Sequence, residues 1–194
     1  MFAALFGLAG CANAAPEPPR AEPPVPTDSP SVSPSEDLED PEAEAPTPEP
    51  LPLPDYPEDL TAEDTAENAI LAAEYFLKLM NYAQSTGDSD LFEDASLPTC
   101  ETCARMVEIQ NERYGNGAYL AGNVITMSEP RSNRTEDGWG WVVIGDAAAT
   151  DGVEVRNGKV TRTISGRIEK NFRIGVQLVD KEWRILEFAR GKDV

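Results

Sequence analysis

Apolar residues recur every three or four positions in the region that follows the proline-rich start of the chain: Ala66, Ile70, Ala73, Phe76, Leu77 and Met80. This spacing places them on one face of an amphipathic helix. Thr61 is the predicted N-cap, because acidic residues follow it where the helix dipole favours negative charge. The helix is expected to run to about Gln84, before Gly87 stops it.

Two shorter helices are predicted after this one. Asp88 or Ser89 would cap a short helix over residues 89–95. Pro98 precedes a further helical stretch over about 100–114, which Gly115 and Gly117 end.

The apolar pattern changes to a period of two in the second half of the chain, which is typical of strands. The alternation runs through residues 139–144, 172–178 and 183–188. The last two runs flank Asp180-Lys181-Glu182, a length suited to a hairpin loop. Helices that precede an antiparallel sheet predict an α+β domain.

The composition divides the chain into two unlike parts. Residues 1–60 hold 15 of the 17 prolines and 13 of the 35 acidic residues, with Arg20 as their one cation. Such a segment cannot bury enough apolar surface to offset its chain entropy, so we expect it to be disordered. Residues 61–194 carry all three tryptophans and have an ordinary length for one domain with one core. We therefore expect a tether over residues 11–60 and a globular domain over residues 61–194.

The extreme N-terminus carries an apolar run, residues 2–10, that is too short to span a bilayer. Its end, Leu8-Ala9-Gly10-Cys11, resembles a bacterial lipobox, in which an aliphatic and two small residues precede a cysteine that is acylated after cleavage. The resemblance implies a signal-peptide remnant over residues 1–10 and a lipid on Cys11. The alternative is an ordinary thiol in a short leader. No lysine or arginine precedes the run, although one is expected there, so we expect the true start to lie upstream or the leader to be incomplete.

The lipid on Cys11 implies a location and a first partner. It would anchor the chain to the cell membrane with the domain on the extracytoplasmic face. The formal net charge of −19 argues against nucleic acid as a partner, because phosphate binding needs clustered cations. Histidine is absent, which removes the usual general base and the commonest zinc ligand. We expect neither a cofactor nor a metal.

Short motifs in the domain resemble known families. The run Tyr82-Ala83-Gln84-Ser85-Thr86-Gly87-Asp88, followed by Leu91-Phe92, is similar to the start of nuclear-transport-factor-2-like domains, and Lys181-Glu182-Trp183-Arg184-Ile185 is similar to their last strand. Together with the lipobox, the acidic tether and a Cys-Glu-Thr-Cys motif, the layout resembles an uncharacterised actinobacterial lipoprotein family. The resemblance implies a cone in which a curved sheet wraps against helices around a cavity. It implies no activity, since this fold hosts enzymes, ligand binders and structural modules.

The Cys-Glu-Thr-Cys motif contains the two cysteines that remain when Cys11 is lipidated, Cys100 and Cys103. An outward-facing compartment favours a structural disulfide between them. A redox-active pair at a helix start and two free thiols are the alternatives. A zinc site would need two further soft or imidazole ligands, which the sequence lacks.

Five residues are candidates for the cavity that the cone fold implies: Tyr75, Tyr82, Trp141, Arg173 and Glu187. Enzymes of the cone fold place an Asp, Tyr or Arg in the cavity as acid, base or oxyanion donor. Rim packing or a surface salt bridge is the alternative for each of the five. Further aromatic and aliphatic area suited to the same concavity comes from Trp139, Phe172, Ile174 and Phe188.

The candidate chemistry favours binding over catalysis. No pair of carboxylates has a spacing that requires general acid–base chemistry, and no nucleophile stands beside a base. The favoured function is a tethered, non-catalytic module that binds a small apolar ligand, a peptide or an envelope protein. The alternative is a hydrolase or isomerase that uses a buried carboxylate or tyrosine in the cone.

Overall fold

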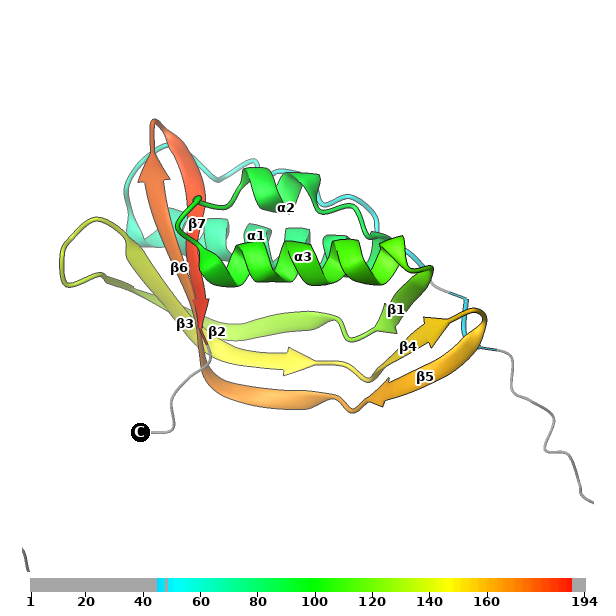
Figure 1. Cartoon of the computed structure of the whole chain (residues 1–194). Coiled ribbons are helices and arrows are strands. Elements are labelled where there is room, and N and C mark those ends of the chain that lie inside the picture. The colour runs from blue at the N-terminus through cyan, green and yellow to red at the C-terminus, as the bar shows by residue number, and fades with distance from the viewer. Residues whose placement is uncertain (1–44, 48, 190–194) are drawn as a thin grey trace, which may run out of the picture. The chain divides into compact units, whose positions relative to one another are not determined.

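Three helices come first along the folded part of the chain: α1 (Ala66–Thr86), α2 (Asp90–Asp94) and α3 (Glu101–Gly115). They lie together on one side of the sheets in the computed structural model, which describes residues 45–47 and 49–189 (Figure 1). The apolar spacing predicted α1 to within four residues, and the capping and glycine signals predicted α2 and α3 to within one residue. The leader, Cys11 and the tether as far as residue 44 lie outside the described residues.

The first helix begins four residues later than the sequence predicted. Thr65 is the N-cap, and its hydroxyl accepts a hydrogen bond from the Asn68 N–H at 3.2 Å. Thr61 instead bonds the side chain of Asn68, whose amide nitrogen donates to the Thr61 hydroxyl at 2.9 Å. The prediction of Thr61 as N-cap is thus wrong, because Thr61 shapes the loop that leads into the helix. The predicted stop at Gly87 is confirmed, since it has the left-handed φ of 80° typical of a helix end.

Within the described residues, seven strands form two antiparallel sheets. The four-stranded sheet has the order β2-β3-β6-β7 and comprises β2 (Ile125–Arg134), β3 (Trp141–Ala149), β6 (Arg167–Val179) and β7 (Glu182–Ala189). The three-stranded sheet has the order β1-β4-β5 and comprises β1 (Ala118–Gly122), β4 (Gly152–Arg156) and β5 (Lys159–Ile164). Helices packed on antiparallel sheets confirm the predicted α+β class.

The predicted hairpin after β6 is present with a shorter turn. Asp180 and Lys181 make the turn with φ values of 51° and 70°, and Glu182 already belongs to β7. Two consecutive residues of positive φ are the geometry that matches the natural twist of paired strands.

Two β-bulges face each other across β3. One interrupts β2 between Ser128 and Arg131, and the other interrupts the pairing of β3 with β6 beside Asp146. Between them, Gly145 approaches β2 so closely that an added Cβ would lie 2.5 Å from the Met127 side chain. Bulges bend strands and increase their twist, which accounts for the bend of the long strands around the helices (Figure 1).

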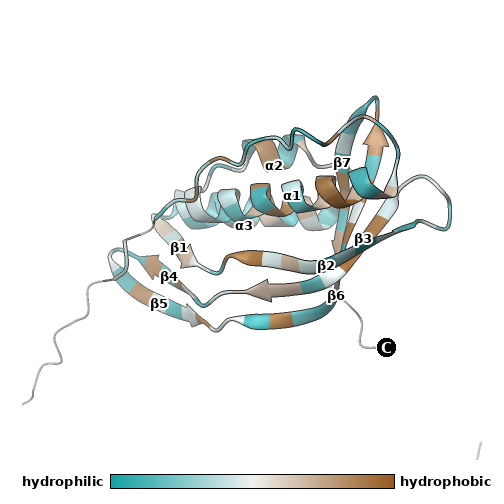
Figure 2. Ribbon diagram, turned by 180° about the vertical axis from the view of Figure 1, so that it is seen from behind, coloured by the Kyte–Doolittle hydropathy of each residue, from teal (hydrophilic) through white to brown (hydrophobic). Residues whose placement is uncertain are grey.

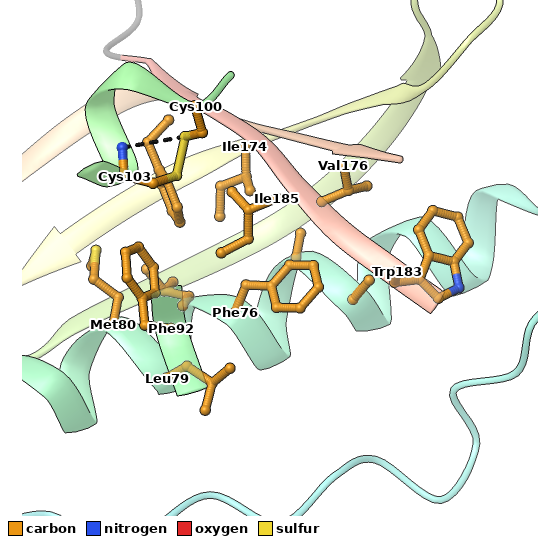
Figure 3. Close-up of a cluster of buried hydrophobic side chains, with 14 of the residues drawn as sticks. Phe76, Leu79, Met80, Phe92, Cys100, Cys103, Ile174, Val176, Trp183 and Ile185 are labelled. Atoms are coloured by element: carbon orange, nitrogen blue, oxygen red, sulfur yellow. Dashed lines mark hydrogen bonds between the residues drawn. A yellow bond between two sulfur atoms is a disulfide. The ribbon is translucent and has the colours of Figure 1, made fainter. Parts of the chain in front are cut away.

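The core fills the space between the helices and the four-stranded sheet. Phe76 points from α1 toward Ile174, Val176 and Ile185 of the sheet, and all four side chains are 2% exposed or less (Figure 3). Apolar and polar bands alternate along several strands in Figure 2, as expected for strands with one face on a core.

β7 holds two segments that are distant from it in the sequence. The Ile185 N–H donates to the carbonyl of Ala95, and the Leu97 N–H donates to the carbonyl of Ile185, each at 2.8 Å. The indole N–H of Trp183 donates to the carbonyl of Thr61 at 2.9 Å across 122 residues of chain. β7 therefore holds the loop between α2 and α3 and the segment before α1 to the same core.

Residues 49–60, the N-terminal strap, pack on the domain ahead of α1. The Leu51 N–H donates to the Ser85 hydroxyl at 3.0 Å, and the ring of Tyr56 lies 5.2 Å from that of Tyr75. Leu60 is only 6% exposed and belongs to the core. Packed chain thus extends N-terminal of residue 61, where composition alone places the start of the domain.

Candidate functional site

An apolar cavity of about 290 Å³, the cone cavity, lies between the helices and the bent part of the four-stranded sheet. Met80 of α1 and Met106 of α3 line its helical side, while Phe172 and Phe188 line its sheet side. The two phenylalanine rings are 6.2 Å apart. Sites for small ligands are typically lined by large apolar side chains, and the volume of this cavity is near the lower end of their usual range.

Two alanines of β3 form the floor of the cone cavity. Ala147 pairs with Glu169 of β6, and Ala149 pairs with Arg167. Paired residues of antiparallel strands share one face of the sheet. The small alanines therefore leave space between the sheet and the helices. The longer side chains of Arg167 and Glu169 on β6 lie at the border of this space.

Glu169 and Arg167 reach the cavity because of the bulge in β6. Phe172 and Ile174 face the core, so uninterrupted alternation would turn residues 168 and 170 inward. The extra residue of the bulge reverses this, and Ile168 is left 70% exposed. The sequence analysis missed Arg167 and Glu169 for this reason. Asn171, with a φ of 54°, was the available signal, because asparagine tolerates the left-handed conformation.

The structure joins Cys100 and Cys103 in a disulfide at the start of α3. Both residues are at most 2% exposed, and Cys100 is the N-cap, with its sulfur accepting from the Cys103 N–H at 3.2 Å. Thr102, between them, lines the cone cavity and accepts a hydrogen bond from the Phe188 N–H at 3.5 Å. The disulfide thus fixes the helix turn that carries one polar group of the cavity rim.

The two candidate tyrosines of α1 lie away from this cavity. Tyr75 packs edge-on against Tyr56 of the N-terminal strap, and burial raises the pKa of its hydroxyl. The Tyr82 hydroxyl donates to Asp88 at 3.1 Å, and this hydrogen bond raises the Tyr82 pKa. Each of the two tyrosines therefore makes a contact between neighbouring segments of the fold.

Trp141 belongs to an ion-pair cluster at the start of α1. Its indole N–H donates to Asp64 at 2.7 Å, and the Arg134 guanidinium lies 4.3 Å above its ring. Arg134 also pairs with the other Asp64 oxygen at 2.6 Å. The hydrogen bond from Trp141 and the Arg134 charge together lower the pKa of the Asp64 carboxyl. This cluster fastens the loop before α1 to the β2–β3 hairpin.

The two candidates on β6 and β7 do not line the cone cavity either. Arg173 follows Phe172 and precedes Ile174, both on the core side, so its side chain starts from the opposite face of the sheet. Glu187 is exposed opposite Gly175. Of the additional aromatic and aliphatic candidates, Phe172 and Phe188 line the cavity, Ile174 is in the core, and Trp139 is 75% exposed.

A second, wider cavity of about 720 Å³, the strap groove, lies between residues 51–55 and the body of the domain. Leu77 and Asn81 of α1 line one side of it, and the start of β2 lines the other. Ile125 lines both cavities, and its backbone is held by Asn81: the side-chain amide donates to the Ile125 carbonyl at 2.7 Å and accepts from its N–H at 3.0 Å. This pair of hydrogen bonds fixes the partition between the cavities.

Within residues 45–47 and 49–189, no helix is long and apolar enough to cross a membrane. The same residues hold no group of three or more His, Cys, Asp or Glu side chains placed to bind a metal ion.

Solved structures with a similar fold share little sequence with this chain. The intermembrane-space region of the chloroplast protein ARC6 is 13% identical, with a TM-score of 0.47, over 66% of this chain and 94% of that one. A putative polyketide cyclase from Pseudomonas putida KT2440 is 10% identical, with a TM-score of 0.32, over 63% of this chain and 92% of that one. No curated protein matches in sequence.

A family of unknown function, DUF6318, matches residues 41–189. The match spans α1 to β7 together with the N-terminal strap, and so includes every element that builds the two cavities. The chain belongs to this family, whose function is unknown.

Proposed function

We propose that this chain is a lipoprotein anchored through Cys11 to the outer face of the cell membrane, and that its domain binds a small apolar ligand without catalysis. The cone cavity carries the proposal. Its walls are methionine and phenylalanine side chains, its floor is alanine, and its polar groups are confined to a few positions such as Thr102 and Arg167. Such a site gains affinity from apolar burial and orientation from a few polar contacts.

The engagement of the tyrosines supports binding over the enzymatic alternative. A cone-fold hydrolase or isomerase would pair a cavity carboxylate with a tyrosine. The hydroxyls of Tyr82, Tyr114 and Tyr119 donate instead to Asp88, to the Gln84 carbonyl and to the Pro46 carbonyl. Glu169 edges the cavity among apolar side chains and alanines, with no tyrosine among the residues that line it.

The acidic, proline-rich sequence supports the tethered part of the proposal. As a polyproline helix at about 3.1 Å per residue, residues 12–44 would reach about 100 Å from an anchored Cys11. Their negative charge would be repelled by anionic lipid headgroups. A binding domain on such a tether can meet its ligand away from the membrane surface.

The test compares two neighbouring alanines of β3 that differ in which face they occupy. Ala149→Leu would place a larger side chain on the cavity floor, whereas Ala148→Leu would add the same atoms to an exposed position. We expect the uncharged dye N-phenyl-1-naphthylamine to fluoresce with saturation on the wild type and on Ala148→Leu, with at least roughly tenfold weaker binding to Ala149→Leu. Equal binding by both variants would refute the cone cavity as the site.

A further inference from the structure

The three-stranded sheet ends in an edge strand, β5, that is open on its outer side. β4 is its one strand neighbour among the described residues, and residues 159–163 are all exposed. In Figure 1 β5 lies at the rim of the domain, away from the helices. An open edge offers unpaired N–H and carbonyl groups along its length, which can pair with another strand.

The other sheet edges each make at least one contact outside their own sheet within the described part of the chain. β1 packs against α1 and α3, and β2 is bonded at Ile125 by Asn81. β7 exchanges hydrogen bonds with the loop between α2 and α3 through Ile185. We place strand addition at β5, because its residues 159–163 are all exposed.

The charge of this edge is opposite in sign to that of the chain. The hairpin formed by β4 and β5 carries Arg156, Lys159 and Arg162 against one carboxylate, Glu154, in a chain of net charge −19. Glu154 lies opposite Arg162 in register and also pairs with Arg113 of α3 at 3.9 Å. The edge thus keeps an excess of positive charge beside its open backbone groups.

We propose that β5 binds an extended acidic segment of a partner protein, which adds to the sheet as a further strand. Backbone pairing would supply the affinity, and the arginine and lysine side chains would select acidic over basic segments. Thr161 is an extra residue in β5, so Lys159 and Arg162, which lie opposite Arg156 and Glu154, share one face of the sheet. The preferred segment therefore carries carboxylates at alternate positions, on one face of the added strand.

The first experiment measures binding of labelled heptapeptides to the full-length protein by fluorescence anisotropy. The probe is acetyl-Glu-Val-Glu-Thr-Glu-Val-Glu-amide, and the matched peptide has lysine in place of glutamate. A third peptide keeps the glutamates but carries N-methyl groups on alternate residues, which blocks strand pairing without changing charge. We expect saturable binding of the acidic peptide alone, together with slower amide exchange over residues 159–164.

The second experiment removes the charge from the edge. We expect the double variant Arg156→Gln/Arg162→Gln to bind the acidic peptide roughly five- to tenfold more weakly than the wild type. The control Lys78→Gln/Arg105→Gln removes two exposed cations from helices α1 and α3 and should bind as the wild type does.

Several outcomes would overturn the proposal. Equal binding of the N-methylated peptide would mean attraction by charge without strand addition. Unchanged binding by the edge variant, or absence of saturable binding, would remove β5 as the site. Sedimentation that shows dimers sensitive to Arg162→Gln would identify a second copy of the chain as the occupant.

Discussion

Asn81 offers the most direct test of how the partition between the two cavities is held. It is 7% exposed, and its side chain satisfies both backbone groups of Ile125. Asn81→Leu keeps the approximate size of the side chain and removes both bonds. Each bond contributes about 1 kcal/mol, and a buried group left without a partner costs about 1–3 kcal/mol. Ile125 is partly exposed, so water would satisfy part of the loss.

We therefore expect Asn81→Leu to lower the free energy of unfolding by between about 2 and 4 kcal/mol. For a domain of this size that corresponds to a fall in Tm of about 4–16 °C. Urea unfolding followed by tryptophan fluorescence measures the change, and hydrogen exchange of the Ile125 amide reports the bond directly. The exposed Asn133→Leu on β2 is the matched control and should change stability by less than about 0.5 kcal/mol. A loss below about 1 kcal/mol, or an Ile125 amide that exchanges at the wild-type rate, would refute the reasoning.

Three further predictions follow from the ion-pair cluster, the disulfide and the lipobox. Trp141→Phe removes the main cause of the lowered Asp64 pKa. The wild type should therefore be more stable than the variant above pH 5, and this difference in stability should shrink as the pH falls through the titration of the carboxyl group. A stability difference that grows in acid would contradict this assignment. Replacing Cys100 and Cys103 by Ala should cost about 2 kcal/mol or less, because the closed loop is so short, and circular dichroism should show the fold retained. Intact mass spectrometry of the membrane fraction, after expression with a complete leader, should find Cys11 acylated, and an unmodified N-terminus would disprove the anchor.

The helices were predictable because their positions follow from local spacing. The stop at Gly87 was also predictable, because glycine readily adopts the left-handed φ of a helix end. Only the fold shows that a side chain at this position would also collide with the tyrosine ring that α3 places beside it. The start was misplaced because Thr61 and Thr65 both precede acidic residues. Only the fold decides which of the two hydroxyls accepts from the Asn68 N–H and so caps the helix. The strands β1, β2, β4 and β5 were not assigned, since bulges or short lengths interrupt their alternation.

The site was harder to predict than the fold class. Phe172 and Phe188 were proposed as cavity residues for their aromatic area, and both line the cavity, whereas Tyr75 and Tyr82, proposed with them, lie elsewhere. Arg167 and Glu169 were missed because a single extra residue in β6 reverses which side chains face inward. A period-two pattern cannot predict the side of a strand beyond a bulge unless the bulge itself is recognised.

The position of β7 in the core determines when, during synthesis of the chain, the domain can complete its fold. Trp183 and Ile185 hold Thr61 and the loop after α2, yet they are synthesised long after both of these segments. At about 5–20 residues per second, the ribosome takes roughly ten seconds to extend the chain from the end of α1 to β7. Throughout that interval the apolar face of α1 lacks the strand that completes its cover. The domain therefore reaches its native state only after β7 has been synthesised, and termination within β7 would leave the earlier elements without a closed core.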